Sequence, residues 1–201
     1  VGGAIANVGA TAWTALTDLA DVRPGDRVLV HGGAGGVGHV AVQLASAAGA
    51  DVIATAGSDE ARDRVADLGA TAALDYESDA LAADVLAATD GAGIETILDH
   101  MLAEHLGVDF EVAADGARIV SLMGHVPEAS GVPLYEKEIA LRGLRMDSRP
   151  VRASMLKRVA DLLERGDLTA AVADTYGLDA AADAHRDISA GGYVGKLVVT
   201  L

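Results

Sequence analysis

The sequence predicts an α/β protein built on a doubly wound parallel sheet with helices on both faces. Short apolar runs bounded by turn residues alternate with Ala-rich runs of helical length along most of the 201 residues. A glycine-rich segment directly follows the first apolar run, 27–31, and opens the helix expected after it. Hydrophobic residues make up 51% of the chain and aromatic residues only 3%, so the core must consist mainly of Ala, Val, Leu and Ile.

Turn and cap residues mark where the predicted elements begin and end. Gly49 ends the first helix, 37–48, because glycine readily adopts the left-handed conformation at a helix C-terminus. Ser58 is a favourable N-cap for the next helix, which reaches about Leu68. The other expected strands are 51–55, 72–74, 95–99, 117–123, 139–146 and 196–201. The other expected helices are 11–19, 79–88, 103–114, 151–165 and 180–189.

The charge and composition exclude several classes of function. A net charge of -15 repels phosphate backbones, which argues against general nucleic-acid binding. Asp outnumbers Glu and lysines are few, which favours a halophilic protein because salt screens self-repulsion; an ordinary acidic protein from a high-GC genome is the alternative. No apolar run reaches the roughly 18 residues of a membrane span, and no signal peptide is evident. The absence of cysteine fits a cytoplasmic protein.

The glycines of segment 31–38, His-Gly-Gly-Ala-Gly-Gly-Val-Gly, carry the chemistry of the chain. They fit a dinucleotide fingerprint in two registers, which begin at Gly32 or at Gly33 and share Gly35 and Gly38. Such a loop lets the backbone approach a diphosphate, and the amides and dipole of the following helix favour its negative charge. No lysine follows Gly38, so the phosphate loop of a nucleoside triphosphatase is excluded. The segment therefore predicts dinucleotide binding.

The end of the second strand favours NADP over NAD. An NAD site usually has an acidic residue there to bond the ribose 2′-hydroxyl, whereas this strand ends in Thr-Ala-Gly-Ser at 55–58. Ser58 can donate a hydrogen bond to a 2′-phosphate, and Arg62 is close enough in sequence to reach one. The alternative is that Ser58 only caps its helix and that Arg62 is solvated.

Together with segment 55–58 and the tail Gly-Tyr-Val-Gly-Lys-Leu-Val-Val at 192–199, the loop resembles the medium-chain dehydrogenase/reductase superfamily. The likeness is to its zinc-independent quinone oxidoreductase (zeta-crystallin-like) branch, and it extends to segments 23–32 and 181–185. The resemblance implies a preceding GroES-like domain, so that we expect a portion of a longer chain. Residues 1–22 would be the hinge from that domain and 23–201 the dinucleotide-binding Rossmann domain, with 190–201 as a closing strand segment.

The resemblance also implies a cofactor site at the ends of the strands. The diphosphate would contact Ala34, Gly35, Gly36 and Val37. The adenosine half would lie beside Gly57, Ser58 and Tyr76, although Tyr76 is equally well explained as a partly buried aromatic residue. The nicotinamide end would lie near Thr11 and against two segments: Met123, Gly124 and His125, and Leu144, Arg145 and Met146. Arg145 departs from the family, whose residues there are usually apolar or small.

The function implied is that of an NADPH-dependent oxidoreductase that reduces a small-molecule quinone or α,β-unsaturated carbonyl compound. An NAD-dependent alcohol dehydrogenase and a non-catalytic nucleotide-binding protein are the alternatives, and no catalytic residue is assigned. The histidines lack metal-ligand spacing and the chain lacks cysteine, so no zinc site is expected and Asp99 is interpreted as structural or supporting. The family likeness implies a homodimer through an edge strand near 139–146.

Overall fold

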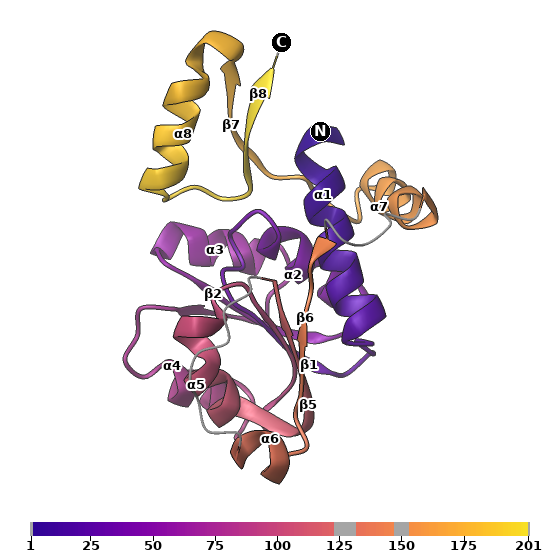
Figure 1. The fold of residues 1–201 in the computed structure, drawn as a ribbon, viewed down its shortest axis with the longest axis vertical. Coiled ribbons are helices and arrows are strands. Elements are labelled where there is room, and N and C mark those ends of the chain that lie inside the picture. The colour runs from indigo at the N-terminus through magenta and orange to yellow at the C-terminus, as the bar shows by residue number, and fades with distance from the viewer. Residues whose placement is uncertain (1, 123–131, 147–152, 201) are drawn as a thin grey trace.

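A computed structural model describes residues 2–122, 132–146 and 153–200. In this part of the chain, a six-stranded parallel sheet has the order β3-β2-β1-β4-β5-β6 (Figure 1). The chain order reverses between β1 and β4, where parallel sheets of this kind bind ligands. The strands are β1 Arg27–Val30, β2 Asp51–Ala56, β3 Ala72–Asp75, β4 Ile94–Asp99, β5 Ala113–Ser121 and β6 Ala140–Gly143. The predicted doubly wound fold is confirmed.

Helices cover both faces of this sheet (Figure 1). Successive side chains of a strand point to opposite faces. Val28 and Val30 accordingly pack into one aliphatic cluster with α1 and α2, whereas Leu29 packs into the other with α4 and α5. The helices are α1 Gly2–Trp13, continued by a π-helical segment Thr14–Leu19, α2 Gly38–Ala47, α3 Asp59–Asp67, α4 Leu81–Ala88, α5 Leu102–Val112, α6 Val132–Glu136, α7 Ala153–Arg165 and α8 Ala181–Ala190.

A second, two-stranded sheet stands apart from the first. Strands β7 Val172–Gly177 and β8 Lys196–Thr200 pair in parallel and are connected by α8 (Figure 1). The chain returns to the main sheet at the glycine loop, where the Gly195 amide donates to the Ala34 carbonyl at 2.8 Å. Strand β7 was not predicted, because its sequence Val-Ala-Asp-Thr-Tyr-Gly is largely exposed and lacks a regular apolar alternation.

The boundary between α5 and β5 also differs from the prediction. The helix expected over 103–114 ends at Val112, and the strand expected from residue 117 begins at Ala113. The Lys137 ammonium donates to the carbonyls of Phe110 at 2.8 Å and Ala113 at 2.9 Å. A cation that satisfies these last carbonyls stabilises the helix end. Because Lys137 lies 24 or more residues away in sequence, no local pattern could reveal this cap.

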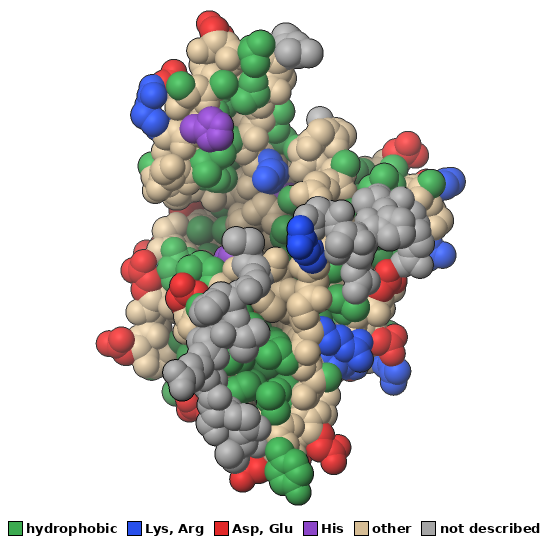
Figure 2. Space-filling view, viewed as in Figure 1, with side chains coloured by type: hydrophobic (Ala, Val, Ile, Leu, Met, Phe, Trp, Pro, Cys, Tyr) green, Lys and Arg blue, Asp and Glu red, His purple; other side chains and the backbone are tan. Residues whose placement is uncertain are grey.

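The surface carries the negative charge in a dispersed form. Figure 2 shows Asp and Glu side chains around the periphery of the visible face rather than in one patch. Where residues are described, no helix combines the length and apolar character needed to cross a bilayer.

Candidate functional site

A cavity of about 1200 Å³ opens at the carboxyl ends of the central strands. Its wall combines the glycine loop, the segments that follow β4, β5 and β6, and one side chain from β8. Dinucleotides bind at this topological position in parallel α/β sheets. Among the residues that line it are Gly35, Gly36, Val37, His100, Leu144 and Lys196.

The turn of the glycine loop is made by Gly32. Gly32 has φ +61°, a left-handed conformation that favours glycine. The Gly35 amide donates to the Gly32 carbonyl at 2.9 Å, and a side-chain carbon on Gly38 would overlap that same carbonyl. Gly33 packs the loop against β2, where an added carbon would lie 2.8 Å from Ala54 Cβ, so the structure requires a glycine at both Gly32 and Gly33.

The amides at the start of α2 are available to a ligand. No described residue accepts a hydrogen bond from the amides of Gly36 and Val37, and both residues line the cavity. Backbone amides at a helix N-terminus bind a diphosphate well. Of the four residues expected at the diphosphate, Gly35, Gly36 and Val37 line the cavity; Ala34 does not, and its carbonyl is bonded to Gly195.

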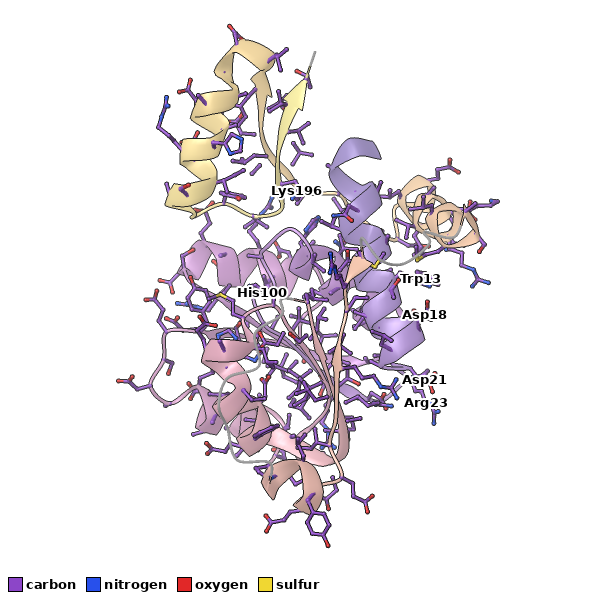
Figure 3. The ribbon with its side chains drawn as sticks, viewed as in Figure 1. Trp13, Asp18, Asp21, Arg23, His100 and Lys196 are labelled. Carbon is purple, nitrogen blue, oxygen red and sulfur yellow. The ribbon has the colours of Figure 1, made fainter. Side chains whose placement is uncertain are left out.

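Lys196 supplies a positive charge to the same loop from the second sheet. Its Cδ and Nζ lie 2.9 Å and 3.2 Å from the position that a side-chain carbon on Gly36 would occupy. Figure 3 shows Lys196 at the base of the β7–β8 unit, facing the main domain. Sequence reasoning used this residue only as part of the family likeness, since its position over the loop depends on packing between the two sheets.

His100 forms the opposite part of the wall (Figure 3). Its ring occupies the space above Gly32, which leaves no room for a side chain there. Burial lowers the pKa of His100, with a smaller opposing effect from Asp99. No local pattern predicts this placement, because His100 precedes α5 and is positioned by the end of β4.

The residues expected at the adenosine half gather at the tips of β2 and β3, outside the lining of this cavity. The Tyr76 hydroxyl fills the space above Gly57, so that a side chain on Gly57 would overlap it. The Ser58 hydroxyl accepts a hydrogen bond from the Ala61 amide at 3.2 Å and is the N-cap of α3. The prediction that Ser58 caps this helix is therefore confirmed.

Arg62 is engaged by carboxylates rather than solvated. Its guanidinium forms ion pairs with Asp59 and with Asp75, the latter at 3.2 Å, and donates to the Ala56 carbonyl at 3.4 Å. A 2′-phosphate would have to compete with these two carboxylates for the guanidinium. The interpretation of Arg62 as a solvated residue is wrong, because Asp75 from β3 reaches it.

The residues expected at the nicotinamide end are partly brought together. Leu144, Arg145 and Met146 all line the cavity, as does Thr11, whose hydroxyl donates to the Asn7 carbonyl at 2.8 Å. Leu144 and Met146 contribute apolar side chains to this part of the wall. Met123, Gly124 and His125 lie outside the described residues.

The residues of the described ranges do not fit a zinc ion. They contain no group of three or more histidines and carboxylates arranged to hold a metal, and the whole chain has no cysteine. Structural and catalytic zinc sites need at least three protein ligands.

These features define a class: α/β proteins that bind a dinucleotide at the switch point of a parallel sheet. The family model described as zinc-binding dehydrogenase matches residues 36–165. The chain belongs to this family and, with its structural neighbours, to the medium-chain dehydrogenase/reductase superfamily of oxidoreductases.

Individual relatives agree with this membership. The chain is 32% identical, over 98% of its length, to a mycocerosic acid synthase-like polyketide synthase of Mycobacterium tuberculosis. It superimposes on an NAD-dependent alcohol dehydrogenase with a TM-score of 0.89 and 30% identity over 96% of the chain. The TM-score is 0.86, with 28% identity over 96% of the chain, for mycobacterial Rv1454c complexed with NADPH. The chain spans 10% of the synthase, 56% of the dehydrogenase and 62% of Rv1454c.

Proposed function

We propose that the chain is the cofactor-binding part of an NADPH-dependent oxidoreductase acting on an α,β-unsaturated carbonyl compound or a quinone. The observation that carries the proposal is the pair of available amides, at Gly36 and Val37, beside the Lys196 ammonium at the cavity. The two amides can donate hydrogen bonds to a dinucleotide diphosphate, and the ammonium offsets part of its negative charge. Similarity to polyketide synthases favours an unsaturated thioester as the carbonyl compound.

The chain's own residues bind and orient, while the bound nicotinamide supplies the hydride. The glycine loop and Lys196 fix the diphosphate, and Leu144 and Met146 form an apolar wall at the end of the cavity where a nicotinamide would lie. Holding the donor in a fixed orientation contributes to rate by proximity. NADPH rather than NADH is supported by the lack of an acidic residue at 55–58 and by the NADPH complex of Rv1454c.

An NAD-dependent alcohol dehydrogenase is the second candidate. The ion pairs of Arg62 favour it, because they occupy the guanidinium that a 2′-phosphate would need. A nucleotide-binding protein without turnover is the third.

The proposal extends to the surroundings of this domain. A GroES-like domain would precede residues 1–22 in a longer chain. The protein would be cytoplasmic and halophilic.

Two copies of the chain would pair through β6, which lies at the edge of the described sheet and exposes Arg142 and Gly143. Size-exclusion chromatography with light scattering in concentrated salt tests the pairing, and a monomer would reject it.

Titration of the protein with NADPH and NADH, followed by thermal unfolding, tests the proposed function. We expect both to raise the unfolding temperature and NADPH to do so at a lower concentration. An equal response removes the preference for NADPH. The lack of any response from folded protein rejects the proposed function. Turnover of an unsaturated thioester or a quinone by the longer chain would separate an enzyme from a binding protein.

A further inference from the structure

Four titratable side chains are buried together directly behind the wall of the cavity. His31 Nε2 lies 2.9 Å from Asp109 Oδ1, and His105 Nδ1 lies 3.1 Å from Asp99 Oδ1. The two imidazole rings are stacked, with centroids 4.1 Å apart. The side chains of His31, Asp99 and Asp109 are fully buried, and 15% of the His105 side chain is exposed. We call these four residues the His–Asp cluster.

The cluster connects three elements at the switch point. His31 follows β1, Asp99 ends β4, and His105 and Asp109 lie one turn apart on α5. Asp99 also accepts a hydrogen bond from the Met101 amide at 2.7 Å. The pair of His31 and Asp109 joins α5 to the end of β1, and His31 lines the cavity. The pair of Asp99 and His105 joins α5 to the end of β4, and Met101, which is bonded to Asp99, also lines the cavity.

Three polar atoms of the cluster have no hydrogen-bond partner among the described residues. Asp99 Oδ2, Asp109 Oδ2 and His31 Nδ1 are buried without a hydrogen-bond partner among them. A buried carboxylate without a matching proton or cation is costly. Protons bound within the cluster therefore decide its stability, and the cluster is neutral when it holds one proton for each of its two carboxylates.

The pKa directions agree with this description. The hydrogen bond to Asp99 raises the pKa of His105, against the effect of burial. Burial raises the pKa of Asp109. Burial also acts to raise the pKa of Asp99, but hydrogen bonds from His105 and the Met101 amide hold it low. The charged and titratable groups that face His105 are Asp99 from β4, His31 after β1, His100 in the following loop, and Glu104 and Asp109 on α5.

We propose that the protonation state of the His–Asp cluster sets how tightly the crevice binds a dinucleotide. With both protons bound, the cluster is neutral and holds the β1 and β4 ends in position. Loss of the His105 proton leaves a buried negative charge behind Gly32, which repels the diphosphate. It also weakens the contact between His105 and Asp99, the carboxylate that accepts from the Met101 amide. The inference rests on the proposed function, because its occupant is a dinucleotide. The four residues are positioning residues and do not touch the reacting atoms.

The test measures the dissociation constant of NADH from about pH 6 to about pH 9, the range of a histidine with a raised pKa. NADH is the probe because its diphosphate keeps a constant charge and it carries no titrating 2′-phosphate. We expect the dissociation constant of the wild-type protein to rise about tenfold across this range. Isothermal titration calorimetry in buffers of different ionisation enthalpy should show proton uptake on binding near the middle of the rise.

The variant His105→Asn separates the effect of the titrating proton from the effect of the hydrogen bond to Asp99. The Asn amide can still donate to Asp99 but cannot titrate. We expect NADH affinity in this variant to be independent of pH and the proton uptake to disappear. The matched control is His185→Asn, which replaces an exposed histidine on α8. This variant should keep the wild-type dependence of NADH affinity on pH. Thermal unfolding confirms that each variant is folded.

The outcomes separate the two proposals. Absence of NADH and NADPH binding at every pH rejects the proposed function and this inference with it. Binding with the same pH profile in the wild-type protein and in His105→Asn overturns this inference alone. In that case the profile belongs to another group, such as His100.

Discussion

Arg62 on α3 and Asp75 at the end of β3 form an ion pair, with Arg62 Nη1 3.2 Å from Asp75 Oδ2. Asp59 holds the other terminal nitrogen of the same guanidinium. The cation best placed to meet a 2′-phosphate is thus already neutralised by two carboxylates. We therefore expect the choice between NADP and NAD to depend on how easily Arg62 leaves Asp75.

The first prediction concerns this choice. Asp75→Asn should lower the dissociation constant of NADPH about fivefold relative to that of NADH, because the guanidinium loses one competing carboxylate. Arg62→Gln should reduce any preference for NADPH by a similar factor. Fluorescence titration with both cofactors measures the two ratios. Asp63→Asn, which changes an exposed carboxylate on α3, is the control. Equal changes for both cofactors in Asp75→Asn would contradict the prediction.

The second prediction concerns Lys196. Lys196→Gln should weaken the binding of NADH and NADPH alike by about tenfold, because it removes one charge-assisted contact with the diphosphate. The loss should shrink as salt is added, since screening weakens the wild-type contact. Lys157→Gln on α7 removes an exposed lysine paired with Asp161 and should leave affinity unchanged. Unaltered affinity in Lys196→Gln would place the diphosphate elsewhere.

The third prediction contrasts two glycines. Gly32→Ala should lower the free energy of unfolding by about 1 to 3 kcal/mol or more, because a left-handed backbone is strained with a side chain. The added carbon would also displace the His100 ring. Gly107→Ala, on α5 with nothing near the added carbon, should raise the free energy of unfolding by about 1 kcal/mol. Urea unfolding measures both, and a shift of the same sign in both variants would oppose this explanation.

The fourth prediction tests the cap of α5. Lys137→Met should destabilise the protein by about 1 to 3 kcal/mol, because the carbonyls of Phe110, Glu111 and Ala113 lose a charged donor. Lys157→Met is the control and should change the free energy of unfolding by less than about 0.5 kcal/mol. Chemical denaturation gives both values. An effect no larger than that of the control would mean that water replaces the ammonium.

The fifth prediction is the pH dependence of stability. His105 has a raised pKa in the folded state, so its contribution is complete below its unfolded value of 6.5 and is lost as the pH rises through the folded value. The free energy of unfolding of the wild-type protein should therefore fall above pH 6.5 relative to that of His105→Asn. Urea unfolding at a series of pH values measures the difference in free energy of unfolding between the wild-type protein and His105→Asn. A difference that stays constant with pH would show that His105 does not titrate and would contradict the prediction.

Much of the fold could be predicted because its signals are local. The apolar run of β1, the Ser58 cap and the glycines of segment 31–38 each act within a few residues, and the structure has all three where expected. The lining positions of Gly36 and Leu144 were expected from family likeness.

The features that the sequence did not reveal depend on contacts between distant segments. Asp75 approaches Arg62 only after β3 pairs with β2, and Lys196 reaches the glycine loop only because the second sheet packs beside it. His31 and Asp109 are 78 residues apart in sequence and meet at 2.9 Å. The amino-acid order alone thus determined the alternation of strands and helices and the diphosphate loop, since these follow from hydrogen bonding and steric limits along a short stretch of backbone. Which charges surround that loop was decided by tertiary packing, because electrostatic partners are chosen by distance in space.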